Sequence, residues 1–434
     1  MTDVGAPFDA VGATAGPAAR GSVARVGIAT AITAVCGYAV LYLAARKLEP
    51  AGFSVFGVFW GAFGLVTGAA NGLLQEATRE VRATLRHPAG PSTRDHSARD
   101  RSARDCGPST RPMWIGAGVG LGAAIVIAGT APLWSARVFA EARPLSVALL
   151  SLGLAGFCLH ATLLGMLAGT DRWSQYGSLM VTDAGIRVVV ASAAFALGWG
   201  LAGFLWATVA GALAWLLLLA ASPAARSAAG LRTAGKTSGF LRGAAHSIAA
   251  AGASAVLVMG FPVLLKATSG ELGAAGGVVI LAVTLTRAPL LVPMTAMQGN
   301  LIAYFVDHRS TRLRALLAPA AIVAALGGVG VVGAALVGPW LMRVAFGPEY
   351  RTSGVLLAWL TVAAVSIALL TLTGAATVAS ALHRAYSIGW VGATVAAAVL
   401  LTLPLSLESR TVIALMCGPL VGIAVHLTAL TRAQ

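Results

Sequence analysis

The sequence carries little charge for its length. Only 10% of its 434 residues are charged, whereas 58% are hydrophobic, and the mean hydropathy is +0.83. A soluble domain carries roughly 25% charged residues, so this chain has too few charges to cover a globular surface. The composition excludes an ordinary soluble protein and predicts that lipid surrounds most of the chain.

Cysteines and motifs for metals or nucleotides are also scarce. Of the four cysteines, three lie in apolar runs and Cys106 stands alone in a polar loop, so no disulfide framework is expected. No His, Cys and carboxylate residues have metal-ligand spacing, and no Gly-rich segment followed by Lys and Ser or Thr predicts ATP hydrolysis. We therefore expect no metal, no cofactor and no enzymatic activity.

The net charge of +15 does not indicate nucleic-acid binding, because the basic residues lie in short turns between apolar runs. These runs approach the 20 or so residues that one helix needs to cross a bilayer. They show no strand-like alternation, which favours helices over a barrel. Twelve runs qualify, near residues 24–45, 53–74, 113–133, 145–168, 176–198, 201–221, 244–265, 272–297, 315–337, 354–380, 386–406 and 411–430.

The two halves of the sequence repeat one arrangement of turn, apolar run, basic turn and apolar run. The endings LAGTDRWSQY (167–176) and SALHRAYS (380–387) align. The repeat predicts an all-α integral membrane protein with about 12 transmembrane helices in two six-helix bundles. The predicted parts are a tail, a first bundle, a linker and a second bundle, at 1–22, 23–221, 222–243 and 244–434.

Lys and Arg are distributed unevenly between the two sides of the predicted membrane. Segments on the side of the N-terminus hold 20 of the 30, those on the other side hold 8, and Arg187 and Arg287 lie within runs. The positive-inside rule then places both termini in the cytoplasm and the protein in the cytoplasmic membrane. The inner segment 87–112 is of low complexity, with SARD at 97–100 and 102–105, and predicts a disordered loop. It is either a tolerated insertion or a contact with a partner or lipid headgroups.

Three segments resemble the polysaccharide flippase branch of the multidrug/oligosaccharidyl-lipid/polysaccharide (MOP) exporter superfamily. They are LAARKLEPAGFSVFGVFW (43–60), SGELGAAGGVVILA (269–282) and VAFGPEYRTSGVLLAWL (344–360), the last followed by the His383-Arg384 turn. The resemblance implies two bundles, related by an axis along the membrane normal, around a cavity that opens alternately to each side. It also implies a cargo consisting of a saccharide on a polyprenyl phosphate or diphosphate. Helices 1, 2, 7 and 8 line much of the cavity in that family.

Charges within the runs are the first candidates for cargo contacts, because each costs at least about 2.5–3.5 kcal/mol at a helix centre. Asp183 is the only carboxylate predicted inside a run, and Arg187 lies four residues later on the same helix face. The two residues are either a cargo-phosphate site or a structural ion pair. Arg287 has no acid within one turn and precedes Pro289 and Pro293. It is the strongest candidate for a phosphate contact.

Polar residues near the inner ends of two runs are further candidates. Glu76 and Arg79 form either an inner gate or a plain helix end at the interface. Asn71 and Gln75 suit sugar hydroxyls, and His246 is either a cargo contact or a hydrogen-bonded interfacial histidine. His160 and His426 are interpreted as structural.

Three hypotheses for function follow. The first is a flippase for lipid-linked saccharides in cell-envelope synthesis, with envelope glycosyltransferases as further partners. The second is an ion-coupled exporter of drugs or metabolites, for which a cationic drug would require acidic cavity residues. The third is a scaffold that transports nothing. A scaffold predicts mutually paired charges, and a flippase predicts that Arg187 and Arg287 share one cavity.

Overall fold

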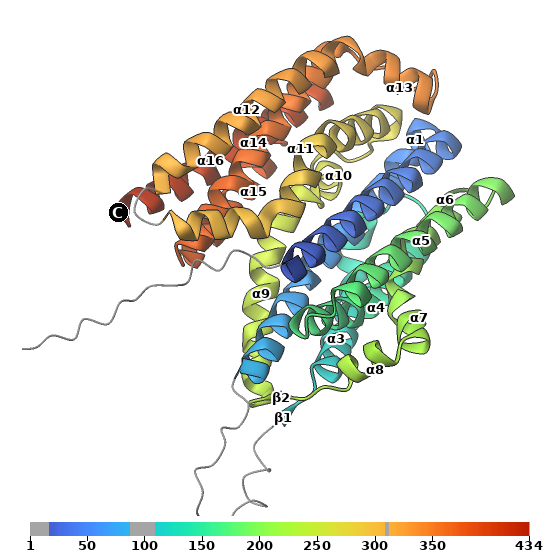
Figure 1. Ribbon diagram of the computed structural model, residues 1–434. Coiled ribbons are helices and arrows are strands. Elements are labelled where there is room, and N and C mark those ends of the chain that lie inside the picture. The colour runs from blue at the N-terminus through green and yellow to red at the C-terminus, as the bar shows by residue number, and fades with distance from the viewer. Residues whose placement is uncertain (1–16, 87–108, 309–311, 434) are drawn as a thin grey trace, which may run out of the picture.

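The computed structural model describes residues 17–86, 109–308 and 312–433 (Figure 1). The tail 1–16 and most of the loop predicted to be disordered, 87–108, lie outside the described residues. The described residues are almost entirely helical. In chain order the helices are α1 (Pro17–Arg86), α3 (Pro112–Val138), α4 (Arg143–Gly169), α5 (Trp173–Leu197), α6 (Gly200–Ala210), the 3-10 turn η1 (Gly211–Leu213), α7 (Ala214–Ala221), α8 (Pro223–Ala229), α9 (Thr237–Val258), α10 (Phe261–Ser269), α11 (Gly273–Asp307), α12 (Arg312–Leu336), α13 (Gly338–Phe346), α14 (Gly354–Ala379), α15 (His383–Leu400) and α16 (Leu407–Arg432).

Helix α1 contains the first two predicted spans. Glu49 has φ 55° and ψ 172°, which no α-helix accommodates, and Pro50 follows it. Arg25 reaches Ser174 at 3.4 Å and Arg82 reaches Asp171 at 3.3 Å, so both ends of α1 lie beside the α4–α5 turn. The chain therefore reverses at Glu49, and α1 is an antiparallel helical hairpin.

The predicted membrane fold is confirmed. Ten helices in the described ranges are long and apolar enough to cross a membrane. α1 accounts for two of the twelve predicted spans, and α15, which is not among the ten, covers most of the run 386–406. The run 244–265 is interrupted, because α9 ends at Val258 and α10 begins at Phe261.

The helices form two lobes (Figure 1). Helices α1 and α3–α8, blue to green, lie on one side, and α12–α16, orange to red, lie on the other. Between them, α9 packs on α1 and α15, and α11 packs on α1 and α14. The lobes touch near Glu49, at the tip of the α1 hairpin. There Phe53 and Phe56 share one apolar cluster with Ile280, Phe346 and Tyr350.

The predicted linker 222–243 is more structured than its composition indicates. It contains α8 and a short strand, β2 (Thr233–Ala234), and α9 begins at Thr237. Strand β2 pairs antiparallel with β1 (Ser109–Thr110), so that Ser109 faces Ala234. The end of the predicted loop 87–112 is thereby fixed to the linker.

Candidate functional site

Arg287 lies inside the bundle on α11, with 7% of its surface exposed. Its Nη1 donates hydrogen bonds to the carbonyls of Val258, at 3.2 Å, and Leu257, at 3.5 Å. Its guanidinium lies over the ring of Phe261, 5.2 Å from the centroid. Arg287 therefore interacts with the end of α9 and the start of α10.

The break between α9 and α10 explains these contacts. In a continuous helix the carbonyl of Val258 would accept a hydrogen bond from residue 262, four positions later. Residue 262 is proline, which has no N–H to donate. In a membrane an orphaned carbonyl costs several kcal/mol, and Arg287 supplies the missing donor. A cation at a helix C-terminus is also favoured by the helix dipole.

Arg287 therefore has backbone partners, which the sequence did not predict, although it has no acid within one turn. Its Nη2 is nevertheless buried without a hydrogen-bond partner. In the part of the chain that the structure describes, Arg287 forms no salt bridge. One guanidinium nitrogen thus keeps a donor available to an anion.

Asp183 and Arg187 form the predicted ion pair on α5. Arg187 Nη2 lies 3.0 Å from Asp183 Oδ1, and Nε donates to both carboxylate oxygens at 3.2 Å. Arg187 Nη1 donates to the carbonyl of Thr208 at 2.7 Å, and its guanidinium lies 5.4 Å from the centroid of the Phe63 ring. Both side chains are mostly buried, and their contacts lie within one lobe.

Arg187 resembles Arg287 in its position beside an interrupted helix. The sixth span changes from α6 through the 3-10 turn η1 to α7. Arg187 bonds to Thr208 just before that turn, and Gly211, in the turn, has no space for a side chain: a Cβ there would lie 2.2 Å from Asp183 Oδ1. Each in-span arginine therefore binds carbonyls of a neighbouring broken helix and covers a phenylalanine ring.

Glu76 lies deeper than the sequence predicts. The second half of α1 continues to Arg86, so the span does not end near residue 74, and Glu76 is 2% exposed. Asp183 is thus not the only buried carboxylate. Glu76 is buried as well, because α1 extends by three turns beyond the predicted end of the span and α9 covers Glu76. Arg79 Nε donates to Glu76 Oε2 at 3.0 Å, and Gly243 of α9 lies directly against the carboxylate.

The remaining predicted residues lie apart from both arginines. Gln75 and His246 are exposed, Asn71 is half-buried, and His246 Nδ1 pairs with the carbonyl of Arg242 at 2.7 Å. The structure brings Glu76 and Arg79 together and Asp183 and Arg187 together. It does not bring Arg187 and Arg287 into one shared site, because their contacts lie on different helices.

The sequence did not predict the partners of His426, a buried polar group in the second lobe. His426 of α16 pairs with Thr373 Oγ1 at 3.1 Å and with the carbonyl of Tyr386 at 3.3 Å, and its ring stacks on that of Tyr386. Its interpretation as structural agrees with these contacts. Gly389 leaves room for the ring, because a Cβ there would lie 2.2 Å from the imidazole.

The arrangement of helices is that of a known class of membrane protein. The chain superposes on the inward-facing conformation of a multidrug resistance MATE family transporter of the MOP superfamily, with a TM-score of 0.65, 16% identity and coverage of 95% of this chain and 98% of that chain. For the outward-facing conformation of a transporter so described, the TM-score is 0.60 at 17% identity, with coverage of 95% and 96%. The fold is therefore that of MATE transporters, and the protein is a multi-pass membrane protein.

Sequence comparison identifies the family more closely. The chain is 70% identical over 430 residues to uncharacterized protein Mb3654 of Mycobacterium bovis, covering 99% of this chain and 96% of that protein. It is 64% identical over 433 residues to uncharacterized protein Rv1510 of Mycobacterium tuberculosis, covering 100% and 96%. The chain belongs to the family of these mycobacterial proteins. No protein-family model matches it.

Proposed function

We propose that this chain is a transporter that moves a polyprenyl-phosphate- or diphosphate-linked saccharide across the cytoplasmic membrane for cell-envelope synthesis. The MATE-type fold supports transport by alternating access. The sequence segments that resemble polysaccharide flippases support the class of cargo. The two lobes would rock about their contact, and envelope glycosyltransferases would supply the cargo.

The state of the buried charges carries the argument for an anionic cargo. The buried carboxylates Asp183 and Glu76 are each already paired with an arginine. A cationic drug would have to displace one of those arginines. Arg287, by contrast, keeps one buried nitrogen without a partner. A phosphate oxygen accepts hydrogen bonds from guanidinium strongly, and it would complete this site.

In this mechanism Arg287 acts at the joint between the lobes. It belongs to α11, which packs on α1 and α14, and it holds the break between α9 and α10. The lobes touch at the Glu49 end, which the distribution of Lys and Arg predicts to face outward. Cargo would then enter from the cytoplasmic side, bind Arg287 and leave after this contact opens.

The experiment is complementation of a strain depleted of the protein, with the accumulating lipid-linked intermediate identified by mass spectrometry. Arg287→Gln is the informative variant, because its amide keeps a hydrogen-bond donor on the side chain but carries no charge. We expect Arg287→Gln to retain membrane abundance and to lose most transport. Arg287→Lys should retain part of the activity, since it keeps the charge and loses the planar fork.

Arg287→Ala provides the comparison for stability. It removes the donor as well as the charge, so its abundance should fall below that of Arg287→Gln. Full complementation by Arg287→Gln would remove the charge from the mechanism. Depletion without any accumulated lipid-linked intermediate would contradict the saccharide assignment itself.

Two alternatives give different results. An exporter of drugs or metabolites, which the fold shared with multidrug resistance transporters favours, predicts drug sensitivity on depletion without a lipid-linked intermediate. A scaffold is favoured by the separate helix contacts of Arg187 and Arg287. It predicts that Arg287→Gln is silent whenever abundance is normal.

A further inference from the structure

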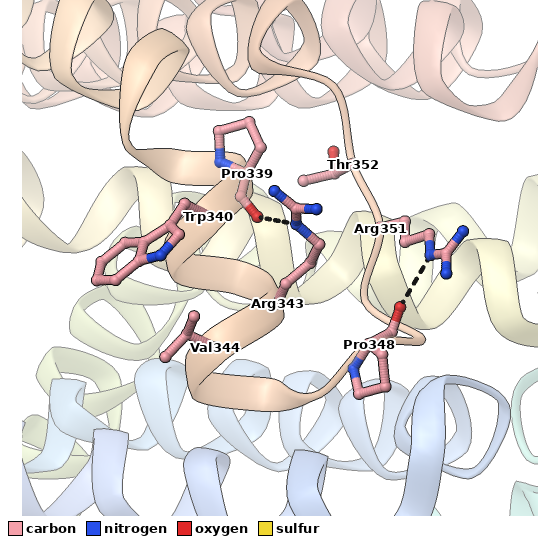
Figure 2. Close-up of a pocket in the computed structure, with 7 residues that line it drawn as sticks. All are labelled: Pro339, Trp340, Arg343, Val344, Pro348, Arg351 and Thr352. Atoms are coloured by element: carbon pink, nitrogen blue, oxygen red, sulfur yellow. Dashed lines mark hydrogen bonds between the residues drawn. The ribbon is translucent and has the colours of Figure 1, made fainter.

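A hollow of about 630 Å³ lies between α13 and the turn after it, and none of its lining residues is among those predicted to contact cargo. Figure 2 shows the residues that line it, which are Pro339, Trp340, Arg343, Val344, Pro348, Arg351 and Thr352. Two of the seven are arginines and none is acidic. The hollow therefore has the charge of an anion site.

Both arginines are anchored through one nitrogen only. Arg343 Nε donates to the carbonyl of Pro339 at 3.3 Å, and Arg351 Nε donates to the carbonyl of Pro348 at 3.2 Å (Figure 2). Among the described residues neither arginine forms a salt bridge. These bonds hold each side chain through Nε, and no described hydrogen bond uses its two terminal nitrogens.

The lining also contains a hydroxyl that lacks a partner. Thr352 Oγ1 is buried and forms no hydrogen bond in the structure. In Figure 2 the guanidinium of Arg343 lies between Pro339 and Thr352. Glu349 lies in the same turn but does not line the hollow, and its Oε2 is beside Gly347, near Arg46.

The position of α13 indicates that the hollow lies at the level of the lipid headgroups. α13 connects α12 to α14, which both cross the membrane, so it lies at one membrane surface. It exposes the apolar side chains of Trp340 (56%), Leu341 and Val344. A short helix with exposed apolar residues beside arginines is typical of an element that lies in the headgroup region, where tryptophan is enriched.

We propose that this hollow binds the headgroup phosphodiester of an anionic phospholipid. The terminal nitrogens of Arg343 and Arg351 would donate to the phosphate oxygens, and Thr352 Oγ1 would donate to a further oxygen. The acyl chains would lie along the apolar side of α13 beside Trp340. The bound lipid would hold the turn that carries Tyr350 into the contact between the lobes, so the site regulates that contact and is separate from the cargo path.

The test is native mass spectrometry of the full chain in detergent, titrated with phosphatidylglycerol and, separately, with phosphatidylcholine. We expect tighter retention of phosphatidylglycerol, because choline would bring a positive charge beside the two arginines. The double variant Arg343→Gln with Arg351→Gln should weaken phosphatidylglycerol binding about a hundredfold, since it removes two charge-assisted contacts that each contribute about tenfold. Both residues are exposed, and the single variants should give intermediate losses.

The matched control is Arg137→Gln with Arg143→Gln, two exposed arginines of the corresponding turn in the first half of the chain. This control should bind phosphatidylglycerol as the unaltered protein does. Equal losses in both double variants would show a general effect of charge and would overturn the proposed site. Unchanged binding in the variant Arg343→Gln with Arg351→Gln would overturn it as well. Displacement of the lipid by equimolar inorganic phosphate would assign the hollow to a soluble anion and overturn the lipid assignment.

Discussion

The phenol of Tyr350 donates a hydrogen bond to the carbonyl of Ala45 at 3.0 Å, across 305 residues of sequence. Tyr350 lies in the turn before α14, and Ala45 lies near the end of the first span, so the bond joins the two lobes. Tyr350 is buried against Phe53, with ring centroids 6.3 Å apart. Burial, and secondarily the charges of Glu349 and Glu49, raise the pKa of Tyr350, so the hydroxyl remains protonated and able to donate at any physiological pH.

The variant Tyr350→Phe should weaken the contact between the lobes while preserving the apolar packing. Loss of one hydrogen bond of about 1 kcal/mol would raise roughly fivefold the population of molecules in which the lobes are separated near Glu49. The measurement is the distance between spin labels at positions 140 and 404, both exposed and one in each lobe, in a background without native cysteines. The control is Tyr304→Phe, because the Tyr304 hydroxyl bonds the carbonyl of Ala315 and so joins α11 to α12, not to the first lobe. Unchanged distances in Tyr350→Phe would show that the apolar cluster alone holds the lobes together.

The variant Asp183→Asn should lower the amount of folded protein, because Arg187 would be left buried without its carboxylate. Breaking a buried pair costs about 3–5 kcal/mol. The double variant Asp183→Asn with Arg187→Gln should recover much of the loss, although the carbonyl of Thr208 would lose its charged donor. Membrane abundance measures both. Recovered abundance without recovered transport would show that the pair also serves the cargo, and equal abundance in all variants would refute a structural role.

The variant Gly243→Ala should destabilise the contact between α9 and α1. A Cβ at this position would lie within 2.5 Å of the Glu76 carboxylate, so either Glu76 leaves Arg79 or the helices separate. We expect a loss of about 1–3 kcal/mol, as overpacking usually costs, seen as a lower melting temperature in detergent. Gly239→Ala is the control on the same helix, since nothing lies within 4 Å of its Cβ and alanine favours the helix. Adding Glu76→Ala to Gly243→Ala should relieve the clash.

The predicted topology is tested with the native Cys106. If the 87–112 loop is cytoplasmic, an impermeant maleimide should label Cys106 only after cell lysis. A cysteine introduced at Ala140, an exposed position at the Glu49 end of the molecule, should label in intact cells in a Cys106→Ser background. Reversal of both patterns would show that the orientation derived from Lys and Arg is wrong.

The sequence predicted the helices well because a membrane leaves few alternatives for apolar runs of this length. It also predicted the Asp183–Arg187 pair, because a spacing of four residues on one helix determines the contact. It did not predict the β1–β2 pairing, since two strands of two residues leave no periodic pattern. The depth of Glu76 was misjudged because α9, about 170 residues later in the chain, covers it.

The partners of Arg287 show which long-range contacts a sequence conceals and which it does not. No sequence pattern around Arg287 predicts Val258 as its partner. Pro262 lies inside an apolar run, however, and any proline there leaves a carbonyl without its helical donor. The unpaired carbonyl was therefore predictable. The break was not, because α11 stays one helix despite Pro289 and Pro293, and the donor was not, because it depends on how α11 packs.

The break beside Arg287 also constrains how this family can diverge. Pro262 creates the vacancy at the Val258 carbonyl, and Arg287, 25 positions later, fills it. A lineage that replaces Pro262 with a residue that has an N–H can restore the helical hydrogen bond to the Val258 carbonyl. That carbonyl then no longer requires the arginine as a donor. A lineage that loses Arg287 first must tolerate an orphaned carbonyl in lipid. Substitutions at the two positions should therefore be correlated among descendants, with the change at 262 coming first unless cargo also depends on the arginine.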